Sequence, residues 1–114
     1  MITNPRYQKA QTVNRYLEND ILDASQETLI LKVYDFAIAN AKIKNIEKTN
    51  KAIQVLIDSL NFKDEEAINM SMDLFNLYKF CQDQVRKRNF EMVEKMLTEL
   101  RDTWAQVFSQ NKKQ

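Results

Sequence analysis

Residues 23–41 read DASQETLILKVYDFAIANA, and this stretch predicts a long helix with a wide apolar face. Ser25 can cap the helix by accepting a hydrogen bond from a free backbone N–H, and Glu27 suits the positive end of the helix dipole. Apolar residues then recur at helical spacing along adjacent lines: Leu29, Val33 and Phe36; Ile30, Tyr34, Ala37 and Ala41; Leu31 and Ile38. At about 100° per residue these positions cover roughly 240°, whereas a helix on one side of a bundle needs little more than about 100°. The extra apolar width must be covered by a central position in a bundle or by something outside this chain.

The composition describes one all-α domain. The chain has 114 residues, 44% of them hydrophobic and 29% charged, with no glycine and a single proline. Tight hairpins and crossover turns need residues that tolerate positive φ, so the lack of glycine argues against a sheet. The net charge of +1 gives no global attraction to nucleic acid or to an anionic membrane. The basic run 86–88 is interpreted as cations at the negative end of a helix dipole, with nucleic-acid binding as the alternative.

Four periodic segments predict an antiparallel up-down four-helix bundle over residues 25–108. The expected helices are residues 26–44, 46–60, 64–88 and 90–108, joined by turns too short for long crossovers. Asn45 and Asn89 mark two of the turns, because asparagine tolerates the left-handed conformation that ends one helix and also caps the next. Residues 109–114 are expected to form a polar, frayed tail.

Residues 1–24 are the least regular part of the sequence. We expect a short irregular or partly helical N-terminal segment, and a disordered tail is the simpler interpretation. The alternative is a mobile cap that covers apolar surface when a partner is absent. The residues that would form this cap are Tyr7, Tyr16, Leu17 and Ile21.

The chain lacks the residues that most active sites and metal centres use. There is no histidine and no glycine, and Cys81 is the only cysteine. These absences remove Ser–His and Cys–His catalysis, His- or Cys-based metal sites and glycine-rich phosphate loops. We therefore expect no catalytic residue, no metal, no cofactor and no enzymatic activity. No apolar run reaches about 18 residues, so no membrane span is expected, and a lone cysteine together with a polar N-terminus fits the cytoplasm.

Five short segments resemble, in order and spacing, the flagellar secretion chaperone FliS family. They are residues 24–38 (ASQETLILKVYDFAI), 45–48 (NIEK), 59–62 (SLNF), 77–80 (LYKF) and 100–104 (LRDTW). The departures are Gln26 for the family's proline, Phe36 for its glycine, and Glu65-Glu66 near its Gly-Gly. The resemblance implies an antiparallel helical bundle that binds the C-terminal segment of flagellin in the cytoplasm. Such a chaperone keeps flagellin unpolymerised and presents it to the flagellar export apparatus, and an N-terminal segment often covers its binding surface.

A disordered client would lay amphipathic turns onto apolar strips of such a bundle. The residues expected to bind it are those that bundle packing cannot easily bury together: Leu31, Tyr34, Ile38, Met72, Phe75 and Phe80. The alternative is a FliS-like helical adaptor or co-chaperone that binds a different export component. Wide apolar faces are also compatible with a homodimer.

Overall fold

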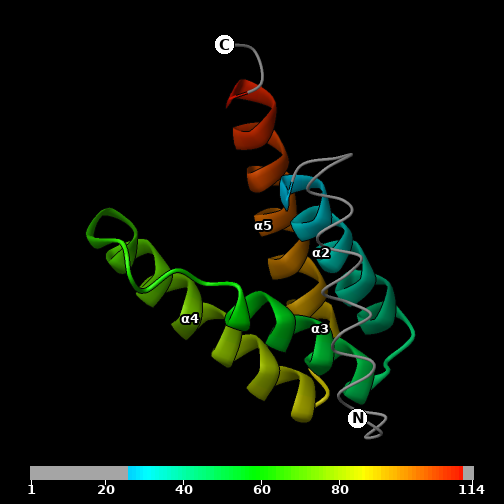
Figure 1. Ribbon diagram of the computed structural model, residues 1–114. Helices are drawn as coiled ribbons and strands as arrows, with labels where there is room; N and C mark the ends of the chain where they lie inside the picture. Colours follow the sequence, from blue (N-terminus) through cyan, green and yellow to red (C-terminus); the bar gives the residue numbers. More distant parts are fainter. Residues whose placement is uncertain (1–25, 112–114) are drawn as a thin grey trace, which may run out of the picture. The chain divides into compact units, whose positions relative to one another are not determined.

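The structure is a computed structural model that describes residues 26–111 of the chain. This part is helical and contains no strand, with α2 at Gln26–Lys42, α3 at Ile46–Asp58, α4 at Glu65–Arg86 and α5 at Phe90–Asn111 (Figure 1). From Leu31 onward the chain forms one compact unit, which contains the rest of α2 and all of α3, α4 and α5. The expected cap residues Tyr7, Tyr16, Leu17 and Ile21, and the expected helix cap Ser25, lie outside the described residues.

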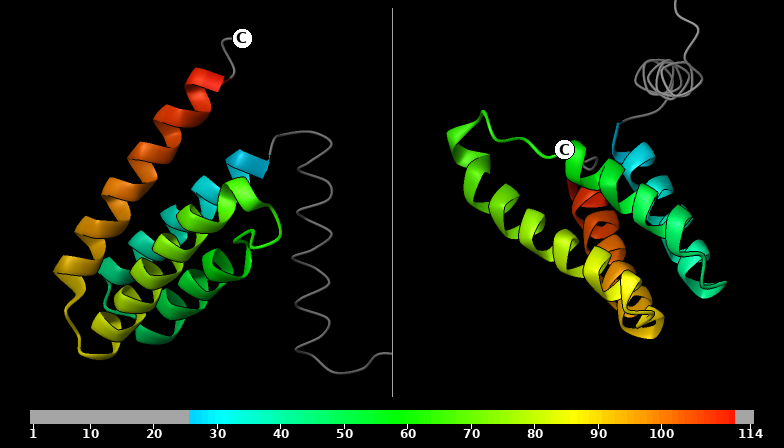
Figure 2. Two further views of the ribbon diagram at one scale, coloured as in Figure 1. Left: turned by 90° about the vertical axis from the view of Figure 1, so that its left-hand side faces the viewer. Right: turned by 90° about the horizontal axis from the view of Figure 1, so that it is seen from below.

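The predicted four-helix bundle is confirmed. Successive helices run in opposite directions, so the α2–α3 and α4–α5 turns lie at the same end (Figure 2). Three of the helices end two residues before the expected position, and α5 continues to Asn111, into the segment expected to be a frayed tail. The early ends of α2 and α4 have a common cause in the geometry of the turns that follow them.

Both of these turns close with the same pair of backbone hydrogen bonds. After α2, the Lys44 N–H donates to the carbonyl of Ala41 (3.0 Å) and the Asn45 N–H donates to that of Asn40 (2.9 Å). This is the Schellman arrangement, which needs one residue in the left-handed region after the helix. Lys44 takes that conformation with φ of 60°, so the helix cannot continue through it.

The α4–α5 turn repeats the pattern residue for residue. The Arg88 N–H donates to Val85 (2.9 Å), the Asn89 N–H donates to Gln84 (2.9 Å), and Arg88 has φ of 65°. The left-handed role expected of the asparagines was therefore wrong, because each basic residue before them takes it. The capping role is seen at Asn45, whose side chain accepts from a backbone N–H of α3 at 2.9 Å.

The α3–α4 connection is held by side chains that replace the missing backbone bonds. The Asn61 side chain accepts from the backbone N–H groups of Lys63 (2.9 Å) and Asp64 (3.2 Å). Asp64 then caps α4 by accepting from the Glu66 N–H at 3.1 Å. Ser71 Oγ donates to the Asn61 carbonyl at 2.6 Å, which fastens the loop to α4.

The core draws on every helix, and a polar contact fixes how α3 and α4 pair. Its most buried large side chains are Tyr34, Thr49, Ile53, Cys81, Val85, Val93 and Leu97. Between α3 and α4, Asn50 and Gln82 each donate to the other's backbone carbonyl at 3.2 Å. This reciprocal pair satisfies the two amide nitrogens in one register only, although the Asn50 Oδ1 stays buried without a partner.

Candidate functional site

Burial along α4 and α5 falls with distance from the turn that joins these two helices. In α4, five of the six buried residues lie between Tyr78 and Val85, and Ser71 is the sixth. In α5, Phe90, Val93 and Leu97 are buried, whereas residues 98–110 contain no buried side chain. Figure 1 shows the two helices separating over the same distance. The apolar side chains at the far end therefore have too few neighbours to be enclosed.

An apolar groove lies between the separated parts of α4 and α5. It consists of two adjoining hollows of about 250 and 230 Å³ that share Leu100 and Thr103. We define the groove by Met70, Leu74 and Leu77 of α4 and by Met96, Glu99, Leu100, Thr103, Trp104 and Val107 of α5, so its lining is apolar apart from Glu99 and Thr103. Met70 is 56% exposed and Val107 is 38% exposed, so the groove is open to solvent.

A buried polar cluster joins three helices beside the groove. The hydroxyls of Tyr34 (α2) and Tyr78 (α4) share a hydrogen bond, and their ring centroids are 6.4 Å apart. Burial raises the pKa of both phenols, while the neighbouring indole of Trp104 on α5 acts in the opposite direction. Trp104 also stacks on Phe108 with centroids 5.5 Å apart. The cluster therefore ties α2, α4 and α5 together through neutral hydroxyls and one indole.

The sequence model of the flagellar protein FliS matches residues 9–111 of this chain. The chain belongs to the FliS family. The family likeness predicted from the five sequence segments is thereby confirmed, and membership implies a flagellar export chaperone. No curated protein and no solved structure matches the chain. Within residues 26–111, no helix is both long enough and apolar enough to cross a bilayer.

The departures from the FliS pattern lie on the surface of the described structure. Phe36, which stands where FliS proteins have glycine, is 51% exposed on α2 and does not enter the core. Glu65 and Glu66 are exposed in the first turn of α4, where their charge suits the helix dipole. Neither departure therefore places a side chain in the core of the described structure.

The residues expected to bind a client do not form one surface. Tyr34 was expected among them, but it is fully buried because its hydroxyl pairs with Tyr78 inside the core. Phe75 is half-buried and packs edge-on against Phe62, with centroids 6.3 Å apart. Met72 and Phe80 are exposed on α4, as a binding role would require. Their part in binding stays a prediction.

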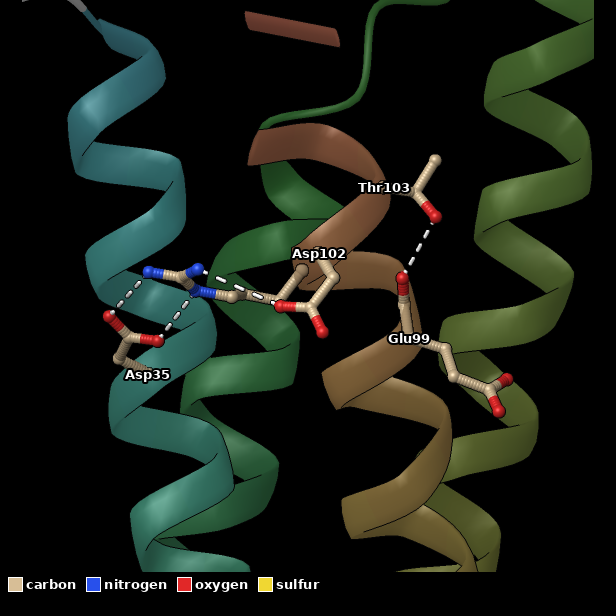
Figure 3. A network of polar contacts seen from close by, with 5 residues as sticks. Asp35, Glu99, Asp102 and Thr103 are labelled. Atoms are coloured by element: carbon tan, nitrogen blue, oxygen red, sulfur yellow. Dashed lines mark hydrogen bonds and ion pairs between the residues drawn. The ribbon is translucent and has the colours of Figure 1, made fainter. Parts of the chain in front are cut away.

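Leu31 and Ile38 lie along the seam between α2 and α5. Both are half-buried, and helical spacing places them on the same side of α2 as Asp35. Arg101 of α5 donates to Asp35 through Nε at 2.9 Å and through Nη2 at 3.5 Å (Figure 3). A second ion pair, between Lys42 Nζ and Glu94 at 3.9 Å, follows on the same side. Leu31 and Ile38 therefore lie on the side of α2 from which two ion pairs reach α5.

Sequence reasoning missed most of the groove. None of its residues was among those expected to bind a client, although Leu74, Leu100 and Val107 stand at helical spacing in the sequence. Their spacing of three and four residues is the same whether a facing helix covers them or not. The signal that pointed to the groove was methionine, since Met70 and Met96 line it and methionine adapts to varied apolar partners.

Proposed function

We propose that this FliS-family protein binds the disordered C-terminal segment of flagellin in the cytoplasm, prevents its premature polymerisation and aids its delivery to the flagellar export apparatus. The family match over residues 9–111 carries the proposal. The open groove between α4 and α5 supplies a surface of the chemistry that such a client needs.

The groove suits an amphipathic helix that forms on binding. Its α4 wall presents Met70, Leu74 and Leu77, which follow one another by four and three residues along one helix face. A client with apolar side chains at similar intervals would set them between the two walls. Burial of about 1,000 Å² or more is needed to offset the ordering of a flexible segment, so the client must extend beyond the groove.

Exposed residues outside the groove can extend the contact. Met72 and Phe80 are exposed on α4, so a client that leaves the groove can continue over that helix. Leu31, Ile38 and Phe75 are half-buried and would add apolar area at the edges. The Tyr34 ring is buried and cannot contact a client directly. Its contribution to binding would be to hold α2 against α4 through the hydrogen bond to Tyr78.

Two matched valine substitutions test the groove. Val107 lines the groove and is 38% exposed, whereas Val55 lies on α3 and is 43% exposed. In isothermal titration with a flagellin C-terminal peptide, we expect Val107→Asp to weaken binding about tenfold or more, because a buried carboxylate loses hydration. Val55→Asp should bind like the unaltered protein. If the two variants bind the peptide with equal affinity, the groove is not the binding site. If the folded, unaltered protein gives no heat on titration, flagellin binding is refuted.

The exposed Phe36 favours one alternative, an adaptor that binds a different export component. An aromatic ring that is 51% exposed on α2 is a feature that the family's glycine cannot provide. Capture of partners from the native cell, followed by mass spectrometry, separates the two functions. Flagellin in the captured material supports the chaperone, and its consistent absence beside another export component supports the adaptor.

A further inference from the structure

The α2–α3 and α4–α5 turns lie at the same end of the bundle (Figure 2). A second concave surface lies at this end. Each turn places one long basic side chain at its left-handed position, Lys44 at φ 60° and Arg88 at φ 65°. Both side chains are exposed, and among the described residues neither belongs to an ion pair. Two cations from separate turns therefore face solvent at the same end of the molecule.

These two cations line one hollow of about 430 Å³, which we name the turn hollow. It is lined by Lys44, Arg88, Asn89, Phe90, Glu91 and Met92. The guanidinium carbon of Arg88 lies 5.5 Å from the centroid of the Phe90 ring, which orients the cation by a cation–π contact. Met92 is 45% exposed and gives the hollow an apolar wall.

Two neighbouring lysines differ from Lys44 and Arg88 in that each belongs to an ion pair. Lys42 pairs with Glu94 at 3.9 Å, and Lys87 pairs with Asp83 at 3.2 Å. Lys44 and Arg88 therefore bring two cations to the turn hollow, beside Glu91 of the lining and the exposed thioether of Met92. A ligand that matches the surface needs carboxylates and at least one apolar side chain.

We propose that the turn hollow binds an acidic peptide segment of a partner protein, with carboxylates on Lys44 and Arg88 and an apolar side chain against Met92. Charge complementarity supports this occupant. A nucleic acid fits less well, because a phosphate backbone offers no apolar side chain to the exposed Met92, whereas Glu91 in the lining opposes either anion. This inference does not rest on flagellin binding, since the groove and the turn hollow lie at opposite ends of the α4–α5 hairpin.

A second copy of the chain is the other occupant that the charges allow. The α3–α4 connection, at the opposite end of the bundle, carries Asp64, Glu65 and Glu66 near the exposed Phe62. Contact between unlike ends is heterologous and builds an open filament unless the rotation closes a ring. A partner protein therefore accounts for the turn hollow better than self-association does.

The backbone conformation at the two turns supports a use for these side chains. A left-handed residue with a Cβ costs about 1–2 kcal/mol, and glycine avoids this. A chain that keeps lysine and arginine at both positions retains strain that glycine would relieve. Strain of this kind is typical of positions whose side chains serve a function.

The test is fluorescence anisotropy of the full chain with a short labelled peptide in which one leucine stands among aspartates and glutamates. We expect saturable binding that weakens as salt is added, and about tenfold or more weaker binding for Lys44→Glu/Arg88→Glu. Lys63→Glu/Lys79→Glu changes the net charge equally at exposed positions outside the hollow and should bind like the unaltered protein. Met92→Ala should weaken binding, and Met92→Leu should retain it.

Several outcomes would overturn the proposal. The first is an equal loss of peptide affinity in the two charge-reversal variants. The second is equal affinity for a peptide that carries amides in place of carboxylates. The third is displacement of the labelled peptide by a short RNA at a lower concentration than by the unlabelled peptide. Sedimentation that shows self-association, abolished by Lys44→Glu/Arg88→Glu, would assign the hollow to a second copy instead. The Val107→Asp variant should still bind the acidic peptide, so failure here and failure of flagellin binding are distinguishable.

Discussion

Replacing Lys44 and Arg88 by glycine should stabilise the protein. Both residues occupy the left-handed region, with φ of 60° and 65°. A side chain with a Cβ pays about 1–2 kcal/mol there. Glycine removes that cost but gives back about 0.5–1 kcal/mol because the unfolded chain gains freedom. The difference is a gain of about 0–1.5 kcal/mol per turn, with a middle value of about 0.75 kcal/mol, and therefore about 1.5 kcal/mol for Lys44→Gly/Arg88→Gly if the two sites act independently.

The assay is urea unfolding followed by circular dichroism. We expect a higher midpoint with an unchanged slope, because the surface exposed on unfolding stays the same. Thermal unfolding should rise by several degrees, since about 1 kcal/mol moves the midpoint by about 4–8 °C in a domain of roughly this size. The same double variant should lose affinity for the acidic peptide, because it lacks both cations.

Lys44→Ala is the matched control for this prediction. Alanine removes the charge but keeps a Cβ at positive φ, so it should bring little or no gain in stability. If alanine stabilises as much as glycine, charge repulsion rather than backbone strain explains the effect. If glycine destabilises either turn, the argument from the left-handed conformation is refuted.

Two further predictions concern the buried hydroxyls and the thiol. Tyr34→Phe should lower the free energy of unfolding by about 1–3 kcal/mol, because it leaves the Tyr78 hydroxyl short of a partner. In the double variant Tyr34→Phe/Tyr78→Phe, the second substitution should lower the free energy of unfolding much less than the first. If urea unfolding shows that the two losses simply add, the prediction is wrong. Burial raises the pKa of the Cys81 thiol from 9.0 to about 11, and that of both tyrosines above 10.0. The unfolded chain therefore releases these protons first, so stability is full below pH 9 and should fall above it, by about 1.4 kcal/mol per pH unit for each titrating group. Cys81→Ala should flatten the curve between pH 9 and 10, and a curve already flat in the unaltered protein would refute the assignment.

The helices could be predicted from the sequence, but their last residues could not. Hydrophobic periodicity and acidic first turns located the starts of α2, α3 and α5 at the residues observed. The ends depend on which residue becomes left-handed, and propensity favoured Asn45 and Asn89. In the structure the closing bonds to Asn40 and Gln84 set the length of each turn, so Lys44 and Arg88 take that position.

The groove could be predicted only in part, because periodicity shows which face of a helix is apolar and not how far away the next helix lies. Leu74 and Leu97 look alike in the sequence, yet one lines an open groove and the other is fully buried. The difference comes from the angle between α4 and α5, which no pattern within a single helix records. Tyr34 shows the reverse case. The sequence predicted an exposed residue that binds a client, but the Tyr34 hydroxyl pairs with that of Tyr78 on α4 and the side chain is buried.

The Tyr34–Tyr78–Trp104 cluster explains how a groove can persist without a client. Apolar walls facing water would gain by closing, at about 25 cal/mol per Å² of surface removed from water. Closure would move α4 against α5 at the place where Tyr78 and Trp104 meet Tyr34 of α2. Hydroxyl pairing depends steeply on distance and angle, whereas apolar contact tolerates sliding. A satisfied polar cluster at the inner end of the groove therefore opposes collapse, which gives the buried hydroxyls a role that a purely apolar core could not fill.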